Sequence, residues 1–150
     1  MKNIKLIISL LLFSTLTVLT ACQKDEADPR DQYLGTWQYT QTGSLTLYYA
    51  GESIGTAPLS DNGSAEITKS GENDLLIDGQ LYTVNGNKLT ANPESINMTD
   101  EGVNMVGTAL FTGQLSSNLI VINSTITGSW SESGGTSGNF SGTVVITLTK

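Results

Sequence analysis

The side chains that offer reactive chemistry in this sequence are mainly carboxylates, hydroxyls and a single thiol. Its 150 residues include 14 Asp plus Glu, one Cys and no His. Without His, the chain has no Ser-His or Cys-His couple to activate a nucleophile and no imidazole ligand for a metal ion. One Cys forms neither an intrachain disulfide nor a thiolate zinc cage. The composition therefore excludes most nucleophilic and zinc-dependent enzymes.

The carboxylates are the remaining candidates for catalysis or metal binding. Hydrolysis by a carboxylate pair needs two acids about 5–10 Å apart inside a cleft. Most acids of residues 33–150 instead lie in predicted turns or on the polar faces of predicted strands. Asp100-Glu101 and Glu72-Asn73-Asp74 lack the regular oxygen spacing of a calcium loop. We therefore expect no enzyme activity, no catalytic residue, no metal site and no cofactor.

The net charge argues against one class of partner. The formal charge of the chain is −7, whereas a nucleic-acid-binding protein needs a basic face. We therefore expect no nucleic-acid partner. Only 14% of the residues are charged, and Thr, Ser, Gly and Asn are abundant instead. This composition favours strands and turns over helices.

The N-terminal segment has the pattern of a signal peptide. Lys2 and Lys5 precede an apolar run over residues 6–19, which is shorter than the roughly 20 residues needed to span a bilayer as a helix. The following Leu19-Thr20-Ala21-Cys22 resembles the bacterial lipobox. That resemblance implies cleavage of a helical signal peptide, residues 1–21, and lipid attachment to Cys22, through which the protein would bind a membrane. The alternative is a plain signal peptide with an incidental Cys.

A second signal follows the cysteine directly. Lys24-Asp25-Glu26 resembles the short export signal of surface lipoproteins in Bacteroidota. The resemblance implies an outer-membrane lipoprotein displayed on the cell surface, whereas a simple charged tether would leave it on the periplasmic face. Residues 22–32 have no large apolar side chain and predict a flexible tether. The folded domain is then 33–150, and the chain that follows the signal peptide carries a charge of −9.

Apolar and polar residues alternate repeatedly along this domain, which is the period of half-buried strands. Turn signals such as Asp78-Gly79 and Asn85-Gly86 separate the alternating segments. The pattern predicts an all-β fold, a single antiparallel meander of eight to ten strands closed into a barrel. A two-sheet sandwich is the alternative. Long crossing loops would favour it, and residues 50–62 are the one such loop that we expect.

The start of the domain resembles a known family. Tyr33-Leu34-Gly35-Thr36-Trp37 is similar to the Gly-x-Trp opening of lipocalins and related calycins. The resemblance implies that Trp37 packs across the closed end of a barrel and that residues 142–150 close the barrel against the first strand. Classical lipocalins stack an Arg on this Trp, but residues 33–150 contain no Arg and only Lys150 lies near in the expected fold.

The aromatic residues suggest where a ligand would bind. Tyr39, Phe111 and Trp130 are expected to face inward with Phe140, and Tyr49 lies near the expected loop. These five residues are the candidate pocket for a small hydrophobic or amphipathic ligand, open near residues 50–62. The alternative is a solid barrel that acts as a structural or interaction component of the envelope. Its interior would be filled by Trp37, Leu47, Ile122, Ile126, Val144 and Ile146.

Overall fold

The structure, a computed structural model, describes residues 27–100 and 102–150. The predicted signal peptide, Cys22 and Lys24-Asp25-Glu26 lie outside these residues. The chain divides into two units, and the second, Gln32–Lys150, contains all the strands found in these described residues. Within the part of the chain that the structure describes, no helix has the length and apolar character needed to span a membrane.

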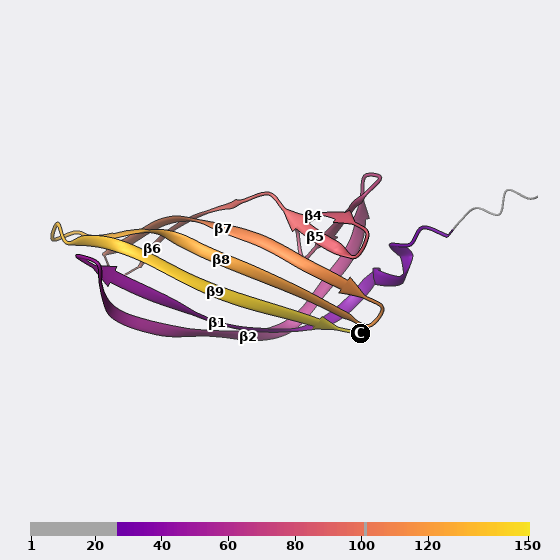
Figure 1. Ribbon diagram of the computed structural model, residues 1–150, viewed down its shortest axis with the longest axis horizontal. Helices are drawn as coiled ribbons and strands as arrows, with labels where there is room; N and C mark the ends of the chain where they lie inside the picture. Colours follow the sequence, from indigo (N-terminus) through magenta and orange to yellow (C-terminus); the bar gives the residue numbers. More distant parts are fainter. Residues whose placement is uncertain (1–26, 101) are drawn as a thin grey trace, which may run out of the picture. The chain divides into compact units, whose positions relative to one another are not determined.

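The elements follow one another with short connections (Figure 1). They are a 3-10 turn (Asp31–Tyr33), β1 (Gly35–Tyr49), β2 (Glu52–Ser70), β3 (Asp74–Ile77), β4 (Gln80–Asn85), β5 (Lys88–Ala91), β6 (Glu94–Asp100), β7 (Val103–Ser116), β8 (Leu119–Glu132) and β9 (Ser137–Thr149).

The nine strands of the described residues belong to one antiparallel sheet that closes into a ring. The strand order is β5-β4-β3-β2-β1-β9-β8-β7-β6, and an additional pairing joins β5 to β7. The last strand pairs with the first over eleven residues of each, from Gln38–Thr149 to Tyr48–Asn139. The predicted all-β meander is therefore confirmed, and the two-sheet alternative is wrong.

Backbone pairing closes the ring of strands at only one end, where β5 meets β7. β5 pairs with the second half of β7, whereas β6 pairs with the first half. β2 pairs with β3 only from Ile67 to Ser70. Along Glu52–Glu66, the only strand that pairs with β2 among the described residues is β1. At the other end, the outer edges of β2 and β6 consequently have no partner strand among the described residues.

The expected loop over residues 50–62 is wrong, because this segment is part of the long strand β2. The chain reverses at Ala50-Gly51, two residues with φ of 49° and 87°, and β2 begins at Glu52. Pro58 lies within this strand, although proline gives no N–H to a ladder. It is accommodated here because β2 has a free edge at that point.

One of two predicted hairpin turns lies where the sequence places it, and the other is shifted by one residue. Asp78-Gly79 joins β3 to β4 as expected, and both residues have positive φ, 47° and 85°, which is the geometry of a type I′ turn. The second turn lies one residue later than predicted. Asn85 still pairs with Lys88, so the turn residues are Gly86 and Asn87, and only Gly86 has a positive φ.

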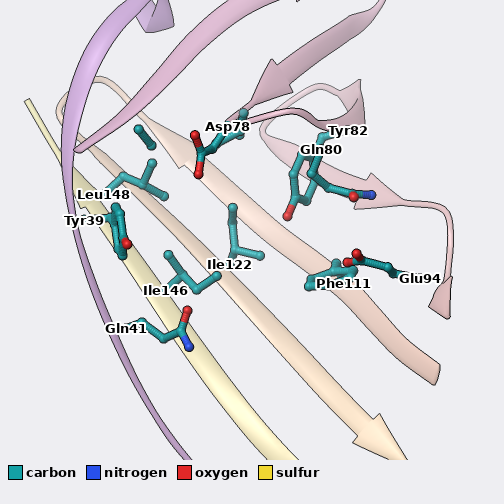
Figure 2. A pocket seen from close by; sticks show the side chains of 12 residues that line it. Tyr39, Gln41, Asp78, Gln80, Tyr82, Glu94, Phe111, Ile122, Ile146 and Leu148 are labelled. Atoms are coloured by element: carbon teal, nitrogen blue, oxygen red, sulfur yellow. The ribbon is translucent and has the colours of Figure 1, made fainter. Parts of the chain in front are cut away.

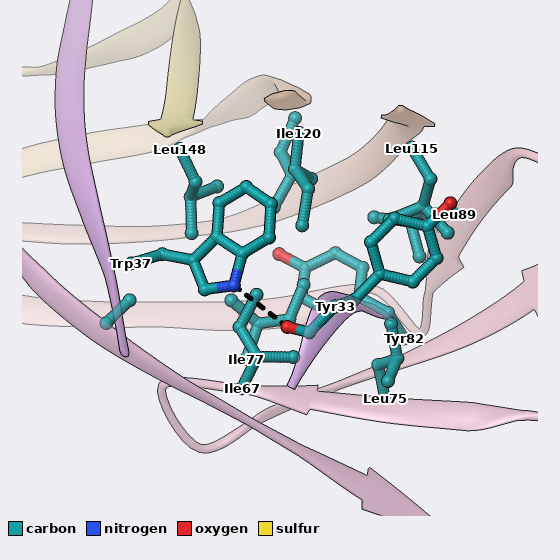
Figure 3. Packing of buried hydrophobic residues seen from close by; sticks show 12 residues of the cluster. Tyr33, Trp37, Ile67, Leu75, Ile77, Tyr82, Leu89, Leu115, Ile120 and Leu148 are labelled. Atoms are coloured by element: carbon teal, nitrogen blue, oxygen red, sulfur yellow. Dashed lines mark hydrogen bonds between the residues drawn. The ribbon is translucent and has the colours of Figure 1, made fainter. Parts of the chain in front are cut away.

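A hydrophobic core fills the complete end of the ring (Figure 3). Trp37 is fully buried at its centre, and its Nε1–H donates to the carbonyl oxygen of Tyr33 at 2.8 Å. Burying a Trp side chain stabilises a fold by roughly 4–6 kcal/mol. The core also contains Tyr33, Ala65, Ile67, Leu75, Ile77, Tyr82, Leu89, Leu115, Ile120, Ile122 and Leu148.

Lys150 covers the outside of this core. Its Nζ lies 5.5 Å from the centre of the Trp37 ring and donates to the carbonyl oxygens of Gln32 and Leu34 at 3.0 and 3.1 Å. The structure thus brings together the two residues predicted to close the barrel. A cation held over an indole face is attracted by the ring quadrupole.

Glycines lie beneath aromatic rings on the inner face of the sheet. Phe140 is paired with Gly128 and reaches Gly107 on the next strand. Trp130 is likewise paired with Gly138, and Tyr39 with Gly63, where a methyl group would lie 3.0 Å from the Tyr39 ring. Glycine in a strand marks close approach of another group, and an aromatic ring laid over it restores the buried contact.

Substitution at one of these glycines tests the packing. We expect Gly128→Ala to lower the free energy of unfolding by about 1–3 kcal/mol, because the new methyl would lie 2.7 Å from Gly107 Cα and would also meet the Phe140 ring. Gly134→Ala is the control, since no heavy atom lies within 4 Å of the added methyl. Urea unfolding of both variants measures the difference, and equal midpoints would contradict this packing.

Candidate functional site

A pocket of about 210 Å³ lies on the inner face next to the core (Figure 2). Ala65, Ile77, Tyr82, Ile122 and Leu148 belong to both the pocket wall and the core. The core surface is therefore the apolar floor of the pocket. The remaining lining residues are Tyr39, Gln41, Asp78, Gln80, Glu94, Phe111 and Ile146.

The sheet register places one wall of this pocket. Tyr39 is paired with Leu148, and Gln41 with Ile146, which is in turn paired with Ile122. Because alternate residues of a strand face the same side, these side chains all face inward. Figure 2 shows Gln80, Tyr82 and Glu94 across from Tyr39, Gln41 and Ile146.

The β3–β4 hairpin places a carboxylate at the rim. Asp78 occupies the turn, and its backbone N–H donates to the carbonyl oxygen of Glu66 at 3.0 Å. This bond ties the hairpin to β2. Aspartate tolerates the positive φ that the turn requires, so local backbone geometry explains why an acid lies at this position.

Tyr39 and Asp61 form a second polar group at the rim. The Tyr39 hydroxyl donates to Asp61 Oδ2 at 2.8 Å, across the β1–β2 pairing. This hydrogen bond raises the pKa of Tyr39, with smaller contributions from burial and from the charges of Asp61 and Asp78. Tyr39 is therefore a neutral hydrogen-bonding group at physiological pH.

Tyr82 is the buried aromatic of the opposite wall. Its ring packs edge-on against Phe111, with the ring centres 6.4 Å apart and an angle of 79° between the planes. Burial, and secondarily the charge of Glu94, raises the pKa of Tyr82 to about 12. Neither tyrosine of the pocket is thus available as a phenolate base at physiological pH.

A second pocket of about 380 Å³ adjoins the first on the side of β6. Gln41, Glu94, Phe111 and Ile146 line both pockets, so the two form adjacent parts of one inner surface. The rest of its lining is Ser95, Ile96, Asn97, Met98, Ala109, Ser124, Ile126 and Val144.

Ser124 is the unusual residue of the second pocket. It is only 4% exposed, and its Oγ has no hydrogen-bond partner among the described residues. A buried hydroxyl without a partner costs about 1–3 kcal/mol. Most of the surrounding buried side chains are apolar, so this serine is a candidate contact for a polar atom of a ligand.

The five predicted pocket residues are not brought together. Tyr39 and Phe111 line the first pocket. Trp130 lines a separate depression near the β1–β2 and β8–β9 turns, where its Nε1–H donates to the Tyr48 carbonyl oxygen at 3.1 Å. Phe140 is buried over glycines, and Tyr49 is 49% exposed and lines none of these pockets.

Several pocket residues were missing from the sequence-based prediction. Tyr82, Ile122 and Ile146 have an alternation signal, since each falls on the apolar face of its strand. Gln41, Asp78 and Glu94 have no such signal, because polar residues at these positions are typical of solvent-facing sites. These three residues line the pocket because the segments that carry them converge there in the folded chain.

No protein-family model matches the chain, and no curated protein or solved structure matches it either.

The raised pKa of Tyr82 predicts how stability depends on pH. A tyrosine that ionises near pH 10 when unfolded but near 12 when folded stabilises the native state below pH 10, and this contribution is lost as the pH rises through 12. We therefore expect the stability of the wild type to fall from pH 10 to 12, and that of Tyr82→Phe to fall less steeply. Urea unfolding across this range measures both slopes, and parallel curves would contradict the assignment.

Proposed function

We propose that residues 33–150 form a lipocalin-like binding module that holds a small hydrophobic or amphipathic ligand on its inner face. The observation that carries the proposal is the pocket beside the core, which has an apolar floor and a polar rim. Pockets of this chemical character are typical of small-molecule sites, where apolar area provides affinity and a few polar groups fix orientation.

The position of the pocket supports this proposal over a solid barrel. Ile122, Val144 and Ile146 are among the residues that a solid barrel would use to fill its interior. Each of them lines a pocket, and Ile146 lines two, although Ile122 also belongs to the core. At the end of the ring away from the core, β2 and β6 have no partner strand on their outer sides among the described residues, and the proposed ligand enters between these two edges.

The N-terminal sequence supports a location for the module. The lipobox-like residues ending at Cys22 favour a lipid anchor, and Lys24-Asp25-Glu26 favours export to the surface of the outer membrane. A lipid-anchored module on a tether meets ligands close to the membrane, which suits a pocket for sparingly soluble molecules.

Blocking the pocket tests the binding function. We expect the full chain, held in zwitterionic lipid nanodiscs, to bind hexan-1-ol, and Ile146→Trp to lower the affinity at least tenfold, because the larger side chain occupies both pockets. Val145→Trp is the matched control, since Val145 is the adjacent residue on the outer face and is 37% exposed. Calorimetric titration with empty nanodiscs as the blank measures both.

Two outcomes would contradict the binding proposal. One is no binding of hexan-1-ol to the wild type above the blank. The other is equal affinity of the two tryptophan variants with unchanged melting temperatures, which would place any binding outside the pocket.

Expression in a Bacteroidota host tests lipid attachment at Cys22 and display of the protein on the cell surface. We expect Cys22→Ser to lose labelling by a clickable palmitate analogue, because the thiol is the proposed attachment point. Replacing Lys24-Asp25-Glu26 with three alanines is expected to protect the protein from protease added to intact cells, with Gln23→Ala as the control. Equal protease sensitivity of the wild type and the triple variant would contradict signal-directed display.

A further inference from the structure

Three acidic side chains surround the mouth of the first pocket. Asp78 and Glu94 line it directly, and Asp61 is bonded to its rim residue Tyr39. They come from the β3–β4 turn, from the start of β6 and from β2. All three are exposed, so their charges face the solvent through which a ligand arrives.

Among the described residues, no basic side chain lines the first pocket or the second. Residues 33–150 contain three Lys against ten acids. Lys150 lies at the opposite side of the core, over Trp37. The mouth therefore carries a negative potential, and a like-charged carboxylate or phosphate ligand is repelled from it.

The acids are not arranged as a metal site. No group of three or more acidic, Cys or His side chains among the described residues is placed to hold a metal ion. Carboxylates spread around an apolar pocket match a diffuse organic cation better than a compact metal ion, which demands several oxygens at one point.

The buried hydroxyl of Ser124 is an independent feature of the same inner surface that points to a ligand. Its hydroxyl is buried and has no partner among the described residues, and it lines the second pocket, which shares Glu94 with the first. Glu94 lies on β6 and Ser124 on β8, two strands away, so a ligand that touches both extends about 10 Å across the sheet.

We propose that the ligand is an amphipathic organic cation, with its charged end at Glu94 and Asp78, its apolar body along Phe111 and Ile146, and a hydrogen-bonding group at Ser124. This inference rests on the proposed binding function and specifies the chemical class of the ligand. The apolar surface provides most of the binding free energy, and the acids select the sign of the charge.

Four probes with the same six-carbon chain separate these contributions. They are hexylammonium, hexan-1-ol, hexanoate and 6-aminohexan-1-ol, each titrated into the full chain in zwitterionic nanodiscs. We expect hexylammonium to bind about tenfold more tightly than hexan-1-ol, and hexanoate to bind least. Raising the salt concentration from 0.01 to 1 M shortens the Debye length from about 30 to 3 Å, so it should weaken only the preference for the cation.

Two variants assign the contacts. Glu94→Gln should lower the affinity for hexylammonium about five- to tenfold and leave that for hexan-1-ol unchanged, whereas Glu132→Gln, at the end of β8, should change neither. Ser124→Ala should lower the affinity for 6-aminohexan-1-ol and leave that for hexylammonium unchanged. It should not lower the melting temperature, because it removes a buried hydroxyl that has no partner among the described residues.

The outcomes distinguish this inference from the proposed function. Binding of hexan-1-ol with equal or tighter binding of hexanoate than of hexylammonium would overturn the cationic ligand and leave the binding function in place. Failure of all four probes would overturn both. Unchanged affinity of Ser124→Ala for 6-aminohexan-1-ol would overturn the contact at Ser124.

Discussion

The short pairing between β5 and β7 is the interaction on which the rest of the structure depends. It joins only three residues of each strand, from Lys88–Gln114 to Thr90–Thr112, yet it converts an open sheet into a ring. Gly113 permits this contact, because a methyl there would lie 3.2 Å from Leu89 Cβ. The backbone N–H of Leu115 adds a hydrogen bond to the Asn87 carbonyl oxygen at 2.8 Å.

This local closure explains why the inner face has two different parts. Where the ring is complete, side chains from all sides meet around Trp37 and exclude solvent. Beyond β5, the partner of β7 is β6, and β2 has no partner on its outer side among the described residues. The inward side chains there line pockets beside the well-packed core.

The proposed function follows from that division. The apolar floor of the pocket is the surface of the core, so it is held rigidly by the same contacts that stabilise the fold. The polar rim comes from the turn at Asp78, the β1–β2 pair Tyr39–Asp61 and the start of β6 at Glu94. The proposed function thus assigns affinity and charge selection to separate elements, which allows them to be tested by separate substitutions.

The sequence alone establishes the strand periodicity, the antiparallel meander and most of the inward residues. Alternation identifies Trp37, Ile122, Val144 and Leu148 because a strand with one buried face must place apolar side chains at every second position. The turn at Asp78-Gly79 is equally local, since its two residues alone account for the required positive φ.

Only the tertiary structure decides which inward residues pack as core and which line a pocket. Tyr39, Phe111, Trp130 and Phe140 have the same sequence signature, yet two line the pocket beside the core, one lines a distant depression and one covers glycines. The difference arises from register and from where the ring closes, which bring Gln41, Asp78 and Glu94 together from distant segments. Such convergence depends on long-range pairing, and no local pattern of residue types records it.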